Sequence, residues 1–135
     1  MQGSGCEMCE TMASERLIYK DSLVFAIPNL FAVNEGHIMV LPVRHVTKDE
    51  DLTDKERLAI QKAVERFAAI AGSMFEDSPI VAKNYGKNSS QPHLHWHILP
   101  SPLGLRDMYS KAFGVPWNKE KTGEELERIA KAYKE

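Results

Sequence analysis

The segment "HLHWHIL", residues 93–99, constrains the fold of this chain more than any other, because polar and apolar residues alternate along it. It holds three of the five histidines. Successive side chains of a strand point to opposite faces of a sheet, so this alternation predicts a strand with all three imidazoles on one face. Leu94, Trp96 and Ile98 then face a hydrophobic core. Three imidazoles on the opposite face require a functional explanation.

A single metal ion bound by all three histidines is a poor explanation. His93 and His97 are four residues apart, which separates their Cα atoms by roughly 13 Å in a strand. Two imidazoles that must each approach zinc to about 2 Å can barely bridge that gap. The spacing favours a division of labour, in which one histidine has one task and the other two have another.

Phosphoryl chemistry is the interpretation that the residues favour. A neutral imidazole is a good nucleophile toward phosphorus, and a second imidazole can stabilise charge on phosphoryl oxygens. His95 and His97 can therefore act as nucleophile and oxyanion partner. A catalytic or structural metal and a plain row of surface histidines remain as alternatives.

The two cysteines lie in "CEMC", as Cys6 and Cys9. This spacing is typical of a metal knuckle or a redox motif. A redox motif requires a preceding strand, whereas only five residues, "MQGSG", precede Cys6. The pair therefore predicts two of the four ligands of a structural zinc site, with an unremarkable thiol pair as the main alternative.

Five segments rich in β-branched and aromatic residues and bounded by turn formers predict strands. They are two strands within 16–28, on either side of Asp21 and Ser22, and then 36–42, 79–84 and 93–99. The segment 101–121 contains proline and glycine and predicts a long loop with a functional or interface role.

Two segments, 53–75 and 122–135, predict helices, each opening with a Thr-x-x-Glu capping box. The expected buried face of the first consists of Ile60, Ala63, Val64, Phe67, Ile70, Ala71 and Met74. Strands with one long helix after the third predict an α+β domain with a five-stranded, largely antiparallel sheet, one long central helix and a short C-terminal helix.

The 135 residues are best explained as a single domain, with a core over about 5–110 and a C-terminal loop and helix over 111–135. A net charge of -2 and a pI near 6.2 argue against nucleic acid as a partner. No apolar run approaches the roughly 20 residues that cross a bilayer, and the polar N-terminus is unlike a signal peptide. We expect a cytoplasmic protein, which can also enter the nucleus by diffusion, and no membrane partner.

"HLHWHIL", together with "GHIMVLP" at 36–42, resembles the signature of the histidine triad (HIT) superfamily of nucleotide hydrolases and transferases, over about residues 5–110. The resemblance implies a homodimer that cleaves at the α-phosphate of purine nucleotides, meaning AMP or GMP derivatives such as phosphoramidates or dinucleoside polyphosphates. A nucleotidyltransferase is less favoured, because those relatives have His-x-His-x-Gln whereas the third position here is His97. A non-catalytic nucleotide-binding or scaffolding protein and a zinc-dependent hydrolase are further alternatives.

The resemblance also implies catalytic roles. His95 attacks the α-phosphorus to give a nucleotidyl-histidine that water hydrolyses, and His97 and His37 contact the phosphate. Asn29 matches the residue that holds the ribose hydroxyls, although an asparagine after proline is also common in turns.

Zinc-bearing members of the superfamily imply the four metal ligands. These are Cys6, Cys9, His45 and His93, which would form a closed structural site. The covalent step on His95 would require no metal.

The segment "NYGKNSSQPH" departs from the Gly-Gln-Ser/Thr lead-in of the family. In one alignment Ser90 is the donor to the leaving group; in the other Gln91 is the family's glutamine and two residues are missing. Asn84 lies closer to His93 than its family counterpart, which favours a shortened loop. Ser90 is thus a candidate catalytic residue, with a plain loop serine as the alternative, and Asn84 and Gln91 are candidate nucleotide contacts.

Overall fold

The structure, a computed structural model, describes residues 5–86 and 92–134. Residues up to Pro102 form one compact unit, and residues from Leu103 onward form a second. The assignment of the whole chain to one domain stays a prediction. Among the described residues, no helix is long and apolar enough to cross a membrane.

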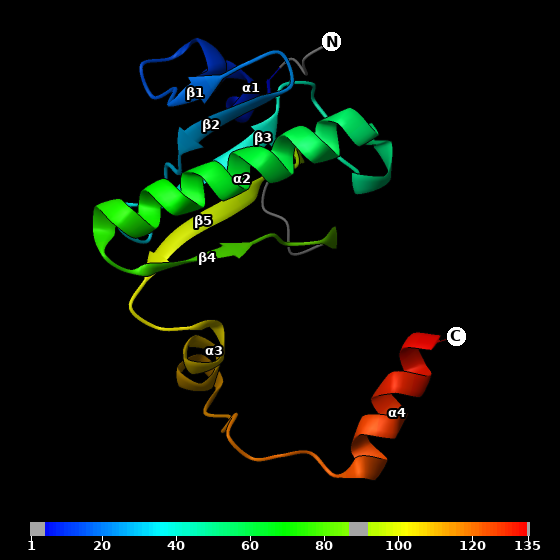
Figure 1. The fold of residues 1–135 in the computed structure, drawn as a ribbon. Helices are drawn as coiled ribbons and strands as arrows, with labels where there is room; N and C mark the ends of the chain where they lie inside the picture. The colour runs from blue at the N-terminus through cyan, green and yellow to red at the C-terminus, as the bar shows by residue number, and fades with distance from the viewer. Residues whose placement is uncertain (1–4, 87–91, 135) are drawn as a thin grey trace. The chain divides into compact units, whose positions relative to one another are not determined.

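The first unit is built on a five-stranded antiparallel sheet, as the sequence predicts (Figure 1). The order across the sheet is β1-β2-β3-β5-β4. The bounds are β1 Tyr19–Lys20, β2 Val24–Pro28, β3 Ile38–Pro42, β4 Ser78–Ala82 and β5 Trp96–Ser101. Since β5 lies between β3 and β4, the end of the histidine segment is in the interior of the sheet.

The last strand starts at Trp96, so the predicted start at His93 is wrong. The N–H of Leu94 donates instead to the carbonyl of Val46, 2.8 Å away, in the segment after β3. The alternation continues through this region: Leu94 and Ile98 are buried in one core cluster, and Trp96 packs against it. The histidines lie on the other face, as predicted: His93 packs on Phe25, His97 is paired with Met39, and the His95 ring lies beside that of His97.

Helix α2, Asp54–Phe75, lies along one face of the sheet (Figure 1). Thr53 and Glu56 form both hydrogen bonds of the expected capping box. Most of the expected apolar face is buried, but Ile70 and Met74 are 42% and 65% exposed. Periodicity identifies an apolar stripe but does not show how much of that stripe the sheet covers.

The other face of the sheet is covered by the N-terminal segment. This segment contains α1, Glu7–Glu10, and a 3-10 turn, η1, at Thr11–Ala13; a second 3-10 turn, η2, lies at Asp49–Asp51. The apolar side chains of the first two pack on β2 and β3 in a second cluster: Cys6, Met8, Cys9, Met12, Phe25, Ile27, Met39 and Leu41. Elements of three or four residues are too short to show a periodicity, so the sequence did not predict them.

The second unit corrects the prediction of a loop over 101–121, because α3, Leu105–Phe113, lies within it. Leu105, Met108 and Tyr109 recur at helical spacing, and Gly114 ends the helix at φ 68°, a left-handed conformation that glycine adopts readily. Glycines and prolines flank this short repeat and favour a loop when the sequence is considered alone. Helix α4, Gly123–Lys134, follows the expected capping box at Thr122.

Gly36, just before β3, lies against β5 and the end of α2. A Cβ at this position would lie 2.5 Å from Pro100 Cγ and 2.7 Å from Phe75 Cε2. We expect Gly36→Ala to lower the free energy of unfolding by roughly 1–3 kcal/mol, since a packed core must then move. Gly72→Ala in α2 is the matched control, because its Cβ would meet only ordinary contacts, the nearest at 3.4 Å. Equal denaturant midpoints for the two variants would contradict this account of Gly36.

Candidate active site

His95 is held with one ring nitrogen engaged by the backbone. Its side chain is 4% exposed, and its Nδ1 lies 2.9 Å from the carbonyl oxygen of His93. A carbonyl only accepts hydrogen bonds, so Nδ1 carries the proton and donates it. The neutral ring therefore has its lone pair on Nε2, the atom that can act as a nucleophile.

His37, just before β3, and His97 in β5 form a hydrogen-bonded pair in which the direction of the bond is fixed. The N–H of Val33 donates to His37 Nδ1 at 3.2 Å, so the neutral His37 ring carries its proton on Nε2. That Nε2–H donates to His97 Nδ1, 2.8 Å away. His97 in turn carries its own proton on Nε2, and its ring centroid lies 4.9 Å from that of His95. The pair thus places an N–H donor next to the His95 ring.

Burial keeps this pair neutral. Desolvation lowers the pKa of His97 to about 4, with smaller contributions from the charges of His95 and His37. Desolvation also lowers the pKa of His37. Neutral rings at pH 7 are the state that the directed pair requires.

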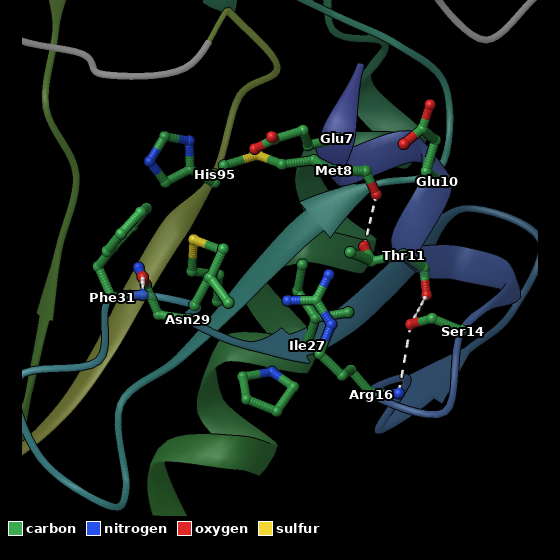
Figure 2. A pocket seen from close by; sticks show the side chains of 13 residues that line it. Glu7, Met8, Glu10, Thr11, Ser14, Arg16, Ile27, Asn29, Phe31 and His95 are labelled. Carbon is green, nitrogen blue, oxygen red and sulfur yellow. Dashed lines mark hydrogen bonds between the residues drawn. The ribbon is translucent and has the colours of Figure 1, made fainter. Parts of the chain in front are cut away.

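A pocket of about 350 Å³ adjoins His95 (Figure 2). Ile27, Met39 and Met8 contribute apolar wall, and Asn29 and Phe31 line it from the loop after β2. Asn29 Oδ1 accepts the N–H of Phe31 at 2.8 Å, and Asn29 Nδ2 lies 3.4 Å from His37 Nε2. Asn29 therefore stabilises a turn, as is common for an asparagine after proline, and it also lines the pocket.

Cys6, Cys9, His45 and His93 converge, although they come from three separate segments. Their ligand atoms all lie within 4.8 Å of one another. Cys9 Sγ is 3.3 Å from His93 Nδ1 and 3.4 Å from His45 Nδ1, and Cys6 Sγ is 3.7 Å from His93 Nδ1. Tetrahedral zinc places sulfur and nitrogen ligands roughly 3.5 Å apart, so this cluster can hold a metal such as zinc.

The protonation of His93 also suits a ligand. Its Nε2–H donates to the carbonyl of Pro42 at 2.8 Å, which leaves the Nδ1 lone pair facing the cysteines. The ring is fully buried, and desolvation lowers its pKa to about 4. A metal ligand must be deprotonated, and His93 already is.

A family model described as HIT domain matches residues 10–102. The chain belongs to the HIT domain family. A crystal structure of a HIT family member from Bacillus subtilis superposes with a TM-score of 0.71 over 96% of this chain and 95% of that chain, at 24% identity, which shows the same α+β HIT fold.

Two relatives of known sequence extend the comparison. The uncharacterized HIT-like protein Rv1262c from Mycobacterium tuberculosis is 34% identical over 92% of this chain and 89% of its own length. A bis(5'-adenosyl)-triphosphatase from Dictyostelium discoideum is 33% identical over 62% of this chain, which spans 58% of that enzyme.

Three further residues of this HIT domain are candidates from the sequence: Asn84, Ser90 and Gln91. Ser90 and Gln91 lie outside the described residues. Asn84 is exposed, its carbonyl accepts a hydrogen bond from Lys83 Nζ at 3.3 Å, and it does not line the pocket beside His95. Phe31 and Arg16 also line the pocket, but they belong to no sequence motif, and only the fold brings them beside His95.

The lowered pKa of His97 predicts a pH dependence of stability. A histidine that ionises at about pH 4 in the folded state and at 6.5 in the unfolded state stabilises the fold above pH 6.5. That contribution is lost as the pH falls from 6.5 toward 4, and we expect it to amount to roughly 1–2 kcal/mol, discounted because the ring is partly exposed. Denaturant unfolding of His97→Gln should therefore depend less on pH in this window than unfolding of the unaltered protein. Parallel pH profiles would contradict the prediction.

Proposed function

We propose that this HIT domain hydrolyses purine nucleotide derivatives at the α-phosphate, through a nucleotidyl intermediate on His95. The observation that carries the proposal is the hydrogen bond from His95 Nδ1–H to the His93 carbonyl, since it directs the lone pair to Nε2 beside a pocket of nucleoside size. The name of the triphosphatase relative supports a nucleotide substrate.

The pocket suits a nucleoside monophosphate group with its phosphate at His95. Among the described residues, Asn29 Oδ1 accepts the N–H of Phe31, and Asn29 Nδ2 lies 3.4 Å from His37 Nε2, which is itself a donor. The Asn29 amide N–H₂ and one oxygen lone pair are therefore left for ribose hydroxyls. The apolar wall of Ile27 and Met39 then faces the base.

The reaction proceeds in two displacements. His95 Nε2 attacks the α-phosphorus, the bond to the leaving oxygen or nitrogen breaks, and the leaving group departs with the electron pair and takes up a proton. The imidazolium character of the nucleotidyl-histidine is stabilised by the bond from Nδ1–H to the carbonyl. Water then attacks phosphorus, the bond electrons return to Nε2, the water proton is released, and the nucleoside monophosphate leaves.

His97 and His37 stabilise the negative charge that develops on the phosphate oxygens. The His37 Nε2–H bond fixes the His97 tautomer, and His97 Nε2–H then donates to a phosphoryl oxygen. Ser90 is the proposed donor to the leaving group, and Asn84 and Gln91 are proposed nucleotide contacts.

The metal of the cysteine and histidine cluster is proposed to be zinc in a closed structural site. Two thiolates and two imidazoles at tetrahedral spacing match its preferred ligand set. A bound zinc supplies no reacting group in that arrangement. Bound by Cys6, Cys9, His45 and His93, it would tie α1 and the segment after β3 to the start of the histidine segment.

A homodimer is proposed as the working assembly. Ile70 and Met74 expose apolar surface on α2, and β4 is an edge strand of the sheet. Sedimentation that finds only monomer at micromolar concentration would contradict this assembly.

The function is tested by trapping the intermediate. The protein is mixed with a nucleoside 5′-phosphoramidate, quenched in base, and analysed by intact and peptide mass spectrometry. We expect a nucleoside monophosphate adduct on His95, most abundant in His97→Gln or Ser90→Ala, and none in His95→Ala. Turnover without an adduct in any variant, and unaffected by His95→Ala, would contradict the mechanism. Binding without turnover would favour a non-catalytic nucleotide-binding role.

A further inference from the structure

Three charged side chains line the pocket beside His95 from the N-terminal segment. They are Glu7 and Glu10 of α1 and Arg16, just beyond η1. All three are exposed, and within residues 5–86 and 92–134 none of them forms an ion pair. Their charges are therefore available to a ligand in the pocket.

The neighbouring hydroxyl groups are already engaged within the segment. Thr11 Oγ1–H donates to the Met8 carbonyl at 2.6 Å, and Ser14 Oγ–H donates to the Thr11 carbonyl at 2.8 Å. Ser14 Oγ in turn accepts the backbone N–H of Arg16 at 3.2 Å. These bonds fix the chain from which the Arg16 side chain extends over Ile27 (Figure 2). The guanidinium and the carboxylates, rather than the hydroxyl donors, are left to recognise a ligand.

The pocket also offers surfaces for a flat ring. Phe31 is 81% exposed at the pocket, although it is a large aromatic residue, and the Asn29 turn fixes its backbone there. The buried side chains of Ile27 and Met39 form an apolar wall of the same pocket. An exposed aromatic beside an apolar wall is a stacking surface for a nucleobase.

The charged groups of Arg16, Glu7 and Glu10 match the hydrogen-bonding edges of guanine better than those of adenine. Guanine presents two acceptors, O6 and N7, that match the paired N–H groups of a guanidinium, and its N1–H and N2–H₂ donors match a carboxylate. Adenine has an amino donor in place of O6, which cannot bond to a guanidinium. We propose that this pocket selects guanine over adenine, with Arg16 reading O6 and N7 and the α1 carboxylates reading N1 and N2. This inference rests on the proposed function, because it assumes that the pocket holds the base of the substrate.

The test compares guanosine and adenosine 5′-phosphoramidates as substrates, and GMP and AMP as ligands in calorimetry. We expect the unaltered protein to prefer the guanine compound roughly tenfold or more in both kcat/KM and Kd. Glutamine pairs with adenine N6 and N7, so Arg16→Gln should reduce the guanine preference by roughly tenfold or more, and should weaken AMP binding little or not at all. Arg57→Gln is the matched control, because Arg57 does not line the pocket, and it should leave both ratios unchanged.

The outcomes separate this inference from the proposed function. If the protein binds GMP more tightly than AMP and Arg16→Gln removes the difference, but neither phosphoramidate is hydrolysed, base selection stands and hydrolysis fails. If both substrates are hydrolysed through His95 at equal rates and both nucleotides bind equally, hydrolysis stands and base selection is overturned. Equal losses for both bases in Arg16→Gln would also overturn it, because Arg16 would then contact a phosphate.

Discussion

Replacing His95 with alanine is expected to lower kcat/KM for a nucleoside 5′-phosphoramidate by at least about a thousandfold, as for other nucleophiles of covalent catalysis. The His93 carbonyl fixes the His95 tautomer, and no other ring among the described residues is held in that way beside the pocket. The His37–His97 pair cannot replace it, because the His97 lone pair on Nδ1 already accepts the His37 N–H. The measurement is steady-state turnover with a fluorogenic or chromatographic readout of the released leaving group.

Two controls make the result specific. Nucleoside monophosphate binding should be retained in His95→Ala, since Asn29 and the apolar walls of the pocket are unaltered. His97→Gln should lose less activity than His95→Ala, because glutamine keeps an amide donor for the phosphate. Turnover of His95→Ala at the unaltered rate would show that the nucleophile is another residue.

Replacing Cys9 with serine is expected to release the metal and to lower the free energy of unfolding by about 3 kcal/mol or more, since metal-binding energy contributes directly to folding at a structural site. Cys9 Sγ lies within 3.4 Å of both ligating imidazoles, so its loss removes the central thiolate of the cluster. The cluster also joins α1 to the segment after β3 and to the start of the histidine segment. The measurements are metal content by mass spectrometry and thermal unfolding with and without chelator.

Met8→Leu is the control for this variant. Met8 is buried between the two cysteines and offers no ligand atom to the cluster, so a substitution of similar volume should leave the metal bound. Chelator should lower the unfolding temperature of the unaltered protein and of Met8→Leu, but not that of Cys9→Ser. A protein purified without metal, whose unfolding is insensitive to both zinc and chelator, would show that the four residues are not a metal site.

The sequence gives reliable information where neighbours in the chain decide the structure. Thr53 and Glu56 cap α2 because a capping box needs only residues three apart. Leu94 and Ile98 are buried and the intervening histidines face the other way because side chains alternate in extended backbone. Helix α1 is too short, at four residues, to show a periodicity. In α3 the apolar residues do recur at helical spacing, but Gly104 and Gly114 flank them and favour a loop from the sequence alone.

In the candidate site, too, the features set by neighbouring residues could be predicted from the sequence, and those set by distant residues could not. The alternation at 93–97 and the Cys-x-x-Cys spacing identify the histidines and the thiolates from the sequence, because the chemistry of each motif depends on residues close in the chain. The tautomer of His95 follows from the carbonyl of His93, only two residues before it, but those of His97 and His93 depend on distant partners: Val33 and His37 for His97, and Pro42 for His93. The pocket residues Phe31 and Arg16 likewise come together only in the fold. Periodicity and spacing encode local geometry, whereas the tautomers of His93 and His97, their pKa values and the pocket walls depend on contacts between distant segments, which exist only once the chain has packed.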